Sequence, residues 1–380
     1  MTPDAFAPVG LYVHWPYCSR ICPYCDFNVV RDRGQAGQRA LFDAMARDLT
    51  TQAGRLGPRQ LVSIFFGGGT PSLLPPDWLA ELVAEARRLF VPADDIEVTM
   101  EANPTHAEAG RFAGFGDGGV NRLSLGIQAF DDAALKFLGR NHSADEARRA
   151  VAMAQSLFDR ISIDLIYALP GQTVAAWQDE LGRAADLGIE HISPYQLTIE
   201  AATAFGRAVR RGQWSPPGED LAEAFYFATQ STLEGAGFEA YEVSNHARGV
   251  AAQSAHNVSI WRGSEYIGIG PGAHGRLKIN GHRQATTALS DIKSYTARVA
   301  ETGIGHDSET LSPLEAEEEA VMLGLRMAEG VALDRVSLLD LNARAVPLIE
   351  QGFMAADATH LRATPQGRVV LDRLLMELLT

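Results

Sequence analysis

Short runs of apolar and β-branched residues alternate with helical patterns from about residue 11 to residue 199. Six runs predict strands, at 11–15, 61–66, 96–100, 122–127, 161–167 and 191–199. Between them, apolar positions recur every three to four residues, which predicts helices around 41–49, 76–90, 143–158 and 174–187. Repeated strand–helix units predict a parallel sheet, so we expect an α/β fold built as a closed or partial (β/α) barrel.

Glycine and polar residues gather where the predicted strands end. They follow the second, third and fourth strands or lie within the fifth: Gly67–Thr70, Glu101, Asn103, Gln128 and Asp164. The carboxyl ends of barrel strands share one face, and sites assemble there from several loops. Glycine and asparagine are also ordinary turn residues. Their recurrence on a common face favours a functional site.

The pattern changes after the sixth strand. Residues 202–290 are less regular and include the glycine-rich GIGPGAHG at 268–275, which we expect to complete or cap the barrel. At Ser312 the sequence SPLE supplies a helix N-cap, a proline at the first helical position and a glutamate at the third. We therefore predict a barrel with its capping segment over residues 1–300 and a small winged-helix-like α+β domain over residues 311–380.

The composition of the chain limits the kinds of molecule and membrane that we expect it to bind. The chain has 380 residues with 33 Lys and Arg against 47 Asp and Glu, a formal net charge of −14. Nonspecific binding to nucleic acid depends on clustered cations, so we expect no nucleic-acid partner. The sequence contains neither an apolar run of about 18 residues nor a secretory signal. We expect no transmembrane segment and a cytoplasmic location, as a monomer or a homodimer.

The three cysteines of the chain, Cys18, Cys22 and Cys25, lie directly after the first predicted strand. Their C-x3-C-x2-C spacing is too tight for a disulfide framework. It places three soft ligands in one loop, as iron–sulfur or zinc sites require. Zinc would need a fourth ligand, for which His14 is the nearest candidate, whereas three thiolates suit a [4Fe–4S] cluster with one open iron. Buried cysteines without a ligand are the remaining alternative.

This segment, with Tyr24 immediately before the last cysteine, resembles the signature of the radical S-adenosylmethionine (SAM) superfamily. Further motifs resemble its oxygen-independent coproporphyrinogen III oxidase group: YVHWPYC at 12–18, GGGTPS at 67–72, EANP at 101–104, SLGIQAF at 124–130, GRNHSADEA at 139–147 and IDLIYALPGQT at 163–173. The resemblance runs through nearly the whole chain. It implies a partial parallel barrel of the radical SAM type.

Within that group the chain resembles the HemW branch, regarded as haem chaperones. The oxidases have a further cysteine two residues after the third, where this chain has Phe27, and a longer extension than the 17 residues before Cys18. The branch also has an HNxxYW-like element. Residues 256–261 read HNVSIW, with Ile260 in place of the tyrosine.

The resemblance implies a protein that binds haem and transfers it to client haemoproteins. A coproporphyrinogen III oxidase, which decarboxylates propionate side chains by radical chemistry, is the alternative. A zinc-bearing barrel that binds small molecules is a third hypothesis.

By resemblance, the three cysteines bind the cluster, and its open iron binds the amino and carboxylate groups of SAM. An electron from a separate donor would then cleave SAM to a 5′-deoxyadenosyl radical. Glycines at 67–69 would let the backbone approach the cofactor closely. The resemblance assigns a further set of residues, besides Tyr24, to contact with SAM: Tyr12, Gly68, Gly69, Thr70, Glu101, Gln128, Arg140 and Asp164. Whether one or two SAM molecules bind is open.

Two histidines are candidates for the axial ligand of haem iron. His256 carries the branch resemblance. His274 lies in the glycine-rich segment, whose backbone could instead approach SAM. A lone histidine is more often a hydrogen-bonded structural residue, so this alternative stays open for both.

Overall fold

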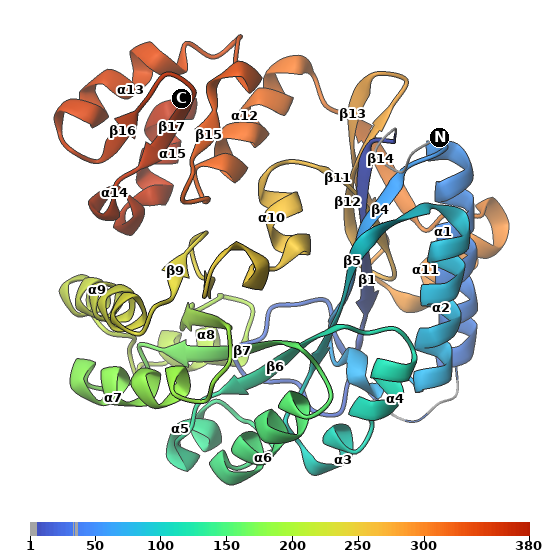
Figure 1. The fold of residues 1–380 in the computed structure, drawn as a ribbon, viewed down its shortest axis with the longest axis horizontal. Coiled ribbons are helices and arrows are strands. Elements are labelled where there is room, and N and C mark those ends of the chain that lie inside the picture. Colours follow the sequence, from blue (N-terminus) through green and yellow to red (C-terminus); the bar gives the residue numbers. More distant parts are fainter. Residues whose placement is uncertain (1–5, 33, 35–36) are drawn as a thin grey trace.

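The computed structural model describes residues 6–32, 34 and 37–380. Within these residues, one large twisted sheet has twelve strands in the order β14-β13-β12-β11-β1-β4-β5-β6-β7-β8-β10-β9 (Figure 1). Six neighbours in this order are parallel: β1 (Pro8–Trp15), β4 (Gln60–Gly68), β5 (Val91–Ala102), β6 (Arg122–Gln128), β7 (Arg160–Tyr167) and β8 (His191–Gln196). These strands confirm the predicted α/β fold with a parallel barrel-like sheet.

The sheet is extended at both ends by strands that are mostly antiparallel. At one end β11 pairs in parallel with β1, and antiparallel strands follow it. These strands are β11 (Glu265–Ile269), β12 (His274–Ile279), β13 (His282–Ala288) and β14 (His306–Thr310). At the other end β10 (His246–Ala247) and β9 (Glu239–Ala240) follow β8. The large sheet therefore continues to residue 310.

Helices cover the outer face of the parallel strands (Figure 1). They are α1 (Gln38–Leu56), α2 (Pro76–Leu89), α3 (His106–Ala109), α4 (Phe112–Asp117), α5 (Asp132–Phe137), α6 (Ala144–Gln155) and α7 (Val174–Ala185). The predicted apolar face of the first helix is buried, since Leu41, Phe42, Met45 and Leu49 are at most 1% exposed. Burial of such a face against the sheet is the main force that fixes a helix there.

The barrel unit contains further short strands, helices and 3₁₀ turns besides these elements. They are β2 (Tyr17–Cys18), β3 (Val30–Arg31), α8 (Ala204–Arg210), α9 (Glu219–Gly235), α10 (Ala255–Trp261), α11 (Ile292–Thr302) and two 3₁₀ turns at Pro71–Leu73 and Val250–Ala252. Helix α10 contacts β1, β4 and β11 and lies between the sheet and the C-terminal unit (Figure 1). It is the element that carries the HNVSIW sequence.

The C-terminal unit has its own sheet and core. It contains α12 (Pro313–Gly324), β15 (Val331–Ala332), a 3₁₀ turn at Leu333–Arg335, α13 (Leu341–Glu350), β16 (Met354–Ala356), β17 (His360–Ala363), α14 (Pro365–Val369) and α15 (Leu371–Leu379). The strand order is β15-β17-β16. Ser312 and Glu315 form the predicted capping box of α12. Glu319 on α12 pairs with Arg276 and Arg283 of the large sheet, which joins the two units.

The division into units at 300 and 311 stays a prediction. The segment between the two limits contains β14, which belongs to the large sheet by its pairing with β13. Within the described ranges, no helix combines the length and apolarity needed to cross a membrane.

Candidate functional site

A cavity of about 520 Å³ lies at the carboxyl ends of the parallel strands. The loop after β1 and the ends of β4, β5, β6, β7 and β8 all contribute to its wall. Eleven of the residues that the resemblance assigns to the cluster or to SAM line it: Cys18, Cys22, Tyr24, Cys25, Gly68, Gly69, Thr70, Glu101, Gln128, Arg140 and Asp164. This shared face is the one at which barrel sites form.

The cysteine loop is held by main-chain hydrogen bonds. The Cys25 amide donates to the Cys22 carbonyl at 3.2 Å, and the Asp32 amide donates to the Cys18 carbonyl at 2.7 Å. Burial raises the pKa of the Cys18 thiol to about 11 and raises that of Cys25 as well. A metal centre binds thiolates and displaces their protons. Three free thiols around one cavity suit a polynuclear iron–sulfur cluster.

His14 is fully engaged within the protein. Its Nδ1 is 3.0 Å from the Tyr12 hydroxyl, and its Nε2 is 2.9 Å from the Asn28 carbonyl oxygen. Because both ring nitrogens have partners, His14 does not offer zinc a fourth ligand in this structure. Among the described residues, no three His, Cys, Asp or Glu side chains are placed to hold a single metal ion.

The glycine loop after β4 is fastened to the segment that leads into the cysteines. The Gly69 amide donates to the Trp15 carbonyl at 2.7 Å, and the Thr70 amide donates to the Tyr17 carbonyl at 2.8 Å. A Cβ atom on Gly69 would lie only 2.7 Å from the Tyr17 oxygen. Glycine is therefore required at this position for close backbone packing. The predicted approach of this loop to SAM stays a prediction.

Two carboxyl groups give the cavity its acidic side. Burial raises the pKa of Glu101 to about 8, and the charge of Asp164 adds to this shift. Burial raises the pKa of Asp164 to about 6, against the lowering effect of the Ser193 and Ser124 hydroxyls. A positively charged or hydroxyl-bearing ligand would relieve the repulsion between the two acids.

Arg140 joins three parts of the cavity wall. Its Nη1 donates to Cys22 Sγ at 3.3 Å, and its Nη2 donates to the Gly126 carbonyl at 2.9 Å and to Asn103 Oδ1. Its Nε is buried without a hydrogen-bond partner among the described residues, which is uncommon for a buried donor. The position of Asn103 at a strand end marked it in the sequence, but its bond with Arg140 could not be predicted.

Gln128 has a positive φ of 69°, which is uncommon for a residue other than glycine. It lies at the end of β6, where the register with β7 is irregular. Such backbone strain is concentrated at binding sites. The end of β8 and the loop after it also line the cavity, with Tyr195, Gln196 and Glu200, which sequence reasoning did not single out.

Tyr12 and His256 lie outside the lining of this cavity among the described residues. Their rings stack at a centroid distance of 6.3 Å, and Phe65 stacks on His256 at 4.9 Å. The Tyr12 hydroxyl contacts His14. The structure therefore places Tyr12 and His256 against each other in the barrel interior, near the cavity wall. The three cysteines line the cavity itself. His274 is exposed on β12 and is 3.5 Å from the Thr287 hydroxyl.

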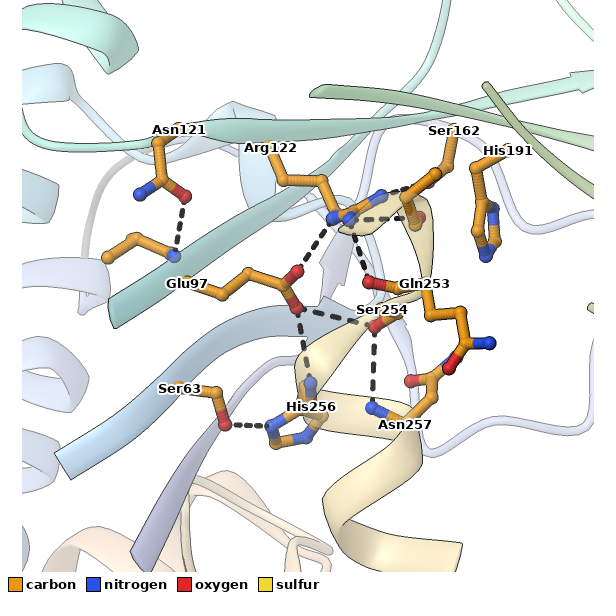
Figure 2. A network of polar contacts seen from close by, with 12 residues as sticks. Ser63, Glu97, Asn121, Arg122, Ser162, His191, Gln253, Ser254, His256 and Asn257 are labelled. Atoms are coloured by element: carbon orange, nitrogen blue, oxygen red, sulfur yellow. Dashed lines mark hydrogen bonds and ion pairs between the residues drawn. The ribbon is translucent and has the colours of Figure 1, made fainter. Parts of the chain in front are cut away.

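A buried polar network fixes His256 (Figure 2). Its Nδ1 is 2.9 Å from Ser63 Oγ, and its amide donates to Glu97 Oε1 at 3.1 Å. Glu97 pairs with Arg122 at 2.8 Å, and Arg122 also donates to the Gln253 carbonyl. The Nε2 atom is buried without a partner among the described residues. Burial lowers the pKa of His256 to about 4, so its ring is neutral at neutral pH.

Comparisons with known proteins extend over the whole chain. The model of the radical SAM superfamily matches residues 12–183, and that of the HemN C-terminal domain matches residues 311–370. Radical S-adenosyl methionine domain-containing protein 1, mitochondrial, of Mus musculus is 40% identical over 395 residues, covering 99% of this chain and 88% of its own. Heme chaperone HemW of Escherichia coli is 34% identical over 381 residues and 97% of each chain.

The fold is also found among solved structures. Coproporphyrinogen III oxidase (HemN) from Escherichia coli aligns with a TM-score of 0.83 and 22% identity, covering 99% of this chain and 91% of the other. At this identity the likeness shows the fold alone. The relatives above, at 34–40% identity over nearly the whole chain, and the two family models show that the chain belongs to the radical SAM superfamily, in the group that includes the HemW heme chaperones.

Proposed function

We propose that this protein is a haem chaperone that binds a [4Fe–4S] cluster and SAM, and that transfers haem to client haemoproteins. The observation that carries the proposal is the 34% identity to proteins named heme chaperone HemW, over nearly the full length of both chains. Phe27, where the oxidases have a further cysteine, supports the same branch.

The cavity residues fit the two cofactors. The three free thiols supply the protein ligands of the cluster, and the Arg140 guanidinium beside Cys22 compensates thiolate charge. Glu101 and Asp164 suit the ammonium and hydroxyl groups of SAM, and the unused Arg140 Nε suits its carboxylate. When bound, the reduced cluster supplies an electron to SAM, and the chain orients the cofactor and keeps water away.

His256 remains the proposed axial ligand of haem. When Nδ1 carries the proton and donates to Ser63, Nε2 keeps a lone pair, as a metal ligand requires. The neutral ring and the unpartnered Nε2 support the proposal. Since Nε2 is buried, ligation requires the α10 segment to shift. An electron donor, a homodimer and a cytoplasmic location also stay proposals, and the relatives named mitochondrial lend the location no support.

The second candidate is an oxygen-independent coproporphyrinogen III oxidase, which the fold shared with HemN favours. The two functions are separated by one experiment. Reconstituted protein is incubated anaerobically with SAM and a reductant, in parallel with coproporphyrinogen III and with haem. The chaperone is expected to give a stable haem complex and no decarboxylated product. Decarboxylated porphyrinogen as the product would select the oxidase instead.

A further inference from the structure

A second cavity, of about 370 Å³, adjoins the one that holds the cysteines. Tyr195, in β8, lines both cavities, and 41% of this residue is exposed. One aromatic side chain therefore forms a wall shared by the two cavities. A ligand in the second cavity would contact Tyr195 and lie next to the cofactor site.

Helix α10 provides a second wall. Asn257, Ile260 and Trp261 line this cavity, whereas His256 lies outside its lining among the described residues. Ile260 follows His256 by four residues and so lies on the same side of the helix, one turn further along. Figure 2 shows His256 held on the sheet side by Ser63 and Glu97. The residues of the HNVSIW element that are open to a ligand in this cavity are therefore Asn257, Ile260 and Trp261.

The C-terminal unit contributes a cation. Arg326, directly after α12, lines the cavity, and its guanidinium carbon is 5.9 Å from the centre of the Trp261 ring. Its Nη1 donates to the Met322 carbonyl at 2.6 Å, and its Nη2 is 3.4 Å from Asp372. The Asp372 side chain is 92% exposed. An exposed pair of this kind contributes little stability, so Arg326 can exchange Asp372 for a ligand at small cost.

Glu242 is the acidic residue of this cavity, and its carboxylate is already engaged. It accepts hydrogen bonds from the Ser244 amide at 3.1 Å and from the Asn245 side chain. Arg326 is therefore the charged side chain free to select a ligand. Two aromatic side chains beside one arginine favour a flat apolar ring system that carries a carboxylate, because guanidinium binds carboxylate with two hydrogen bonds.

We propose that the second cavity is the haem-docking site, with Arg326 paired to a haem propionate and Trp261 and Tyr195 against the macrocycle. This proposal rests on the haem-binding function proposed above. It assigns the C-terminal unit a direct part in ligand binding. It also places the porphyrin beside the cofactor cavity and against α10, the helix that carries His256.

The test compares haemin with haemin dimethyl ester, whose propionates carry no charge, by absorbance titration of the full chain. Arg326→Gln is expected to weaken haemin binding about tenfold or more, the effect of losing one charge-assisted contact. The same variant is expected to bind the dimethyl ester as the wild type does. Trp261→Leu should weaken both ligands, since it removes contact with the ring.

Arg373→Gln is the matched control, because this arginine is exposed in the same unit and pairs with Glu377 along α15. It is expected to bind haemin like the wild type. Wild-type haemin affinity in both Arg326→Gln and Trp261→Leu would overturn the docking site while leaving the haem function intact. A wild-type chain that binds no haemin would overturn the function itself. If Arg326→Gln does not fold, Arg326→Lys, which keeps the charge but not the planar fork, is expected to bind haemin less tightly than the wild type; unchanged affinity would contradict the proposal.

Discussion

Arg140 Nη1 donates to Cys22 Sγ across 3.3 Å, which ties the cysteine loop after β1 to the segment between α5 and α6. The same guanidinium reaches the end of β6 through the Gly126 carbonyl. One side chain thus links the proposed cluster ligands to the strand ends that form the rest of the cavity. Its role can be tested apart from that of the cysteines.

Arg140→Gln is expected to lower the affinity for SAM at least about tenfold, because a buried charged donor to the cofactor is lost. Equilibrium binding of SAM to the reconstituted protein measures this, normalised to cluster content. Arg148→Gln is the control, since Arg148 is exposed on α6 and pairs with Asp145. Equal SAM affinity in the Arg140 variant and the wild type would remove Arg140 from the site.

Gly69→Ala is expected to destabilise the protein by about 1–3 kcal/mol and to lower cluster loading, since the added Cβ meets the Tyr17 carbonyl oxygen. Thermal unfolding and iron content measure the two effects. Gly182→Ala is the matched control, because its Cβ, in α7, meets no atom within 4 Å. That change should be neutral or slightly stabilising. Equal behaviour of the two variants would mean that the loop tolerates a side chain.

Glu101 is expected to make the cofactor-free protein less stable as the pH rises. Its pKa of about 8 in the folded state exceeds the ordinary value of 4.5. The folded state therefore holds the extra proton between these values, and stability is lost as the pH rises from about 4.5 to about 8. The loss is of the order of a few kcal/mol at most, because the carboxyl faces a cavity open to water.

Glu101→Gln should flatten this pH dependence in denaturant unfolding, whereas Glu301→Gln, at an exposed position on α11, should leave it unchanged. A wild-type slope in the Glu101 variant would show that another group titrates in this range. SAM binding by the wild type should strengthen over the same pH range, since the ionised carboxylate attracts the cationic cofactor.

His256→Ala is expected to weaken haem binding or to change the absorption spectrum of the iron, while cluster content and SAM affinity persist. It should also cost about 1–3 kcal/mol of stability, because the ring contacts Phe65 and Ser63 in the barrel interior. His274→Ala is the control at an exposed position. Haem spectra and affinity identical to those of the wild type would exclude His256 as the axial ligand.

The sequence was sufficient to predict the parallel strands and the face on which the site assembles, because strand–helix alternation leaves few topologies. Glu101 and Gln128 could be placed at strand ends from local pattern alone. Tyr12 differs, since it lies inside β1, and only the packed structure shows that its hydroxyl contacts His14. Resemblance identified its motif but not which way its side chain points.

The surroundings of His256 could not be predicted for the same reason. Its partners Ser63 and Glu97 belong to strands more than 150 residues earlier in the chain. The period of a short helix does not determine which side faces the sheet. The second cavity likewise depends on how Arg326 of the C-terminal unit meets Trp261, a contact between two units that no local pattern encodes.

Iron and acid-labile sulfide content after anaerobic reconstitution tests most directly whether Cys18, Cys22 and Cys25 form the complete ligand set of the cluster. The wild type is expected to hold about four of each per chain. Each single Cys→Ser variant is expected to lose the cluster, because the chain has no fourth cysteine to replace the missing thiolate. Near-stoichiometric iron and sulfide in any one of the three variants would contradict the assignment.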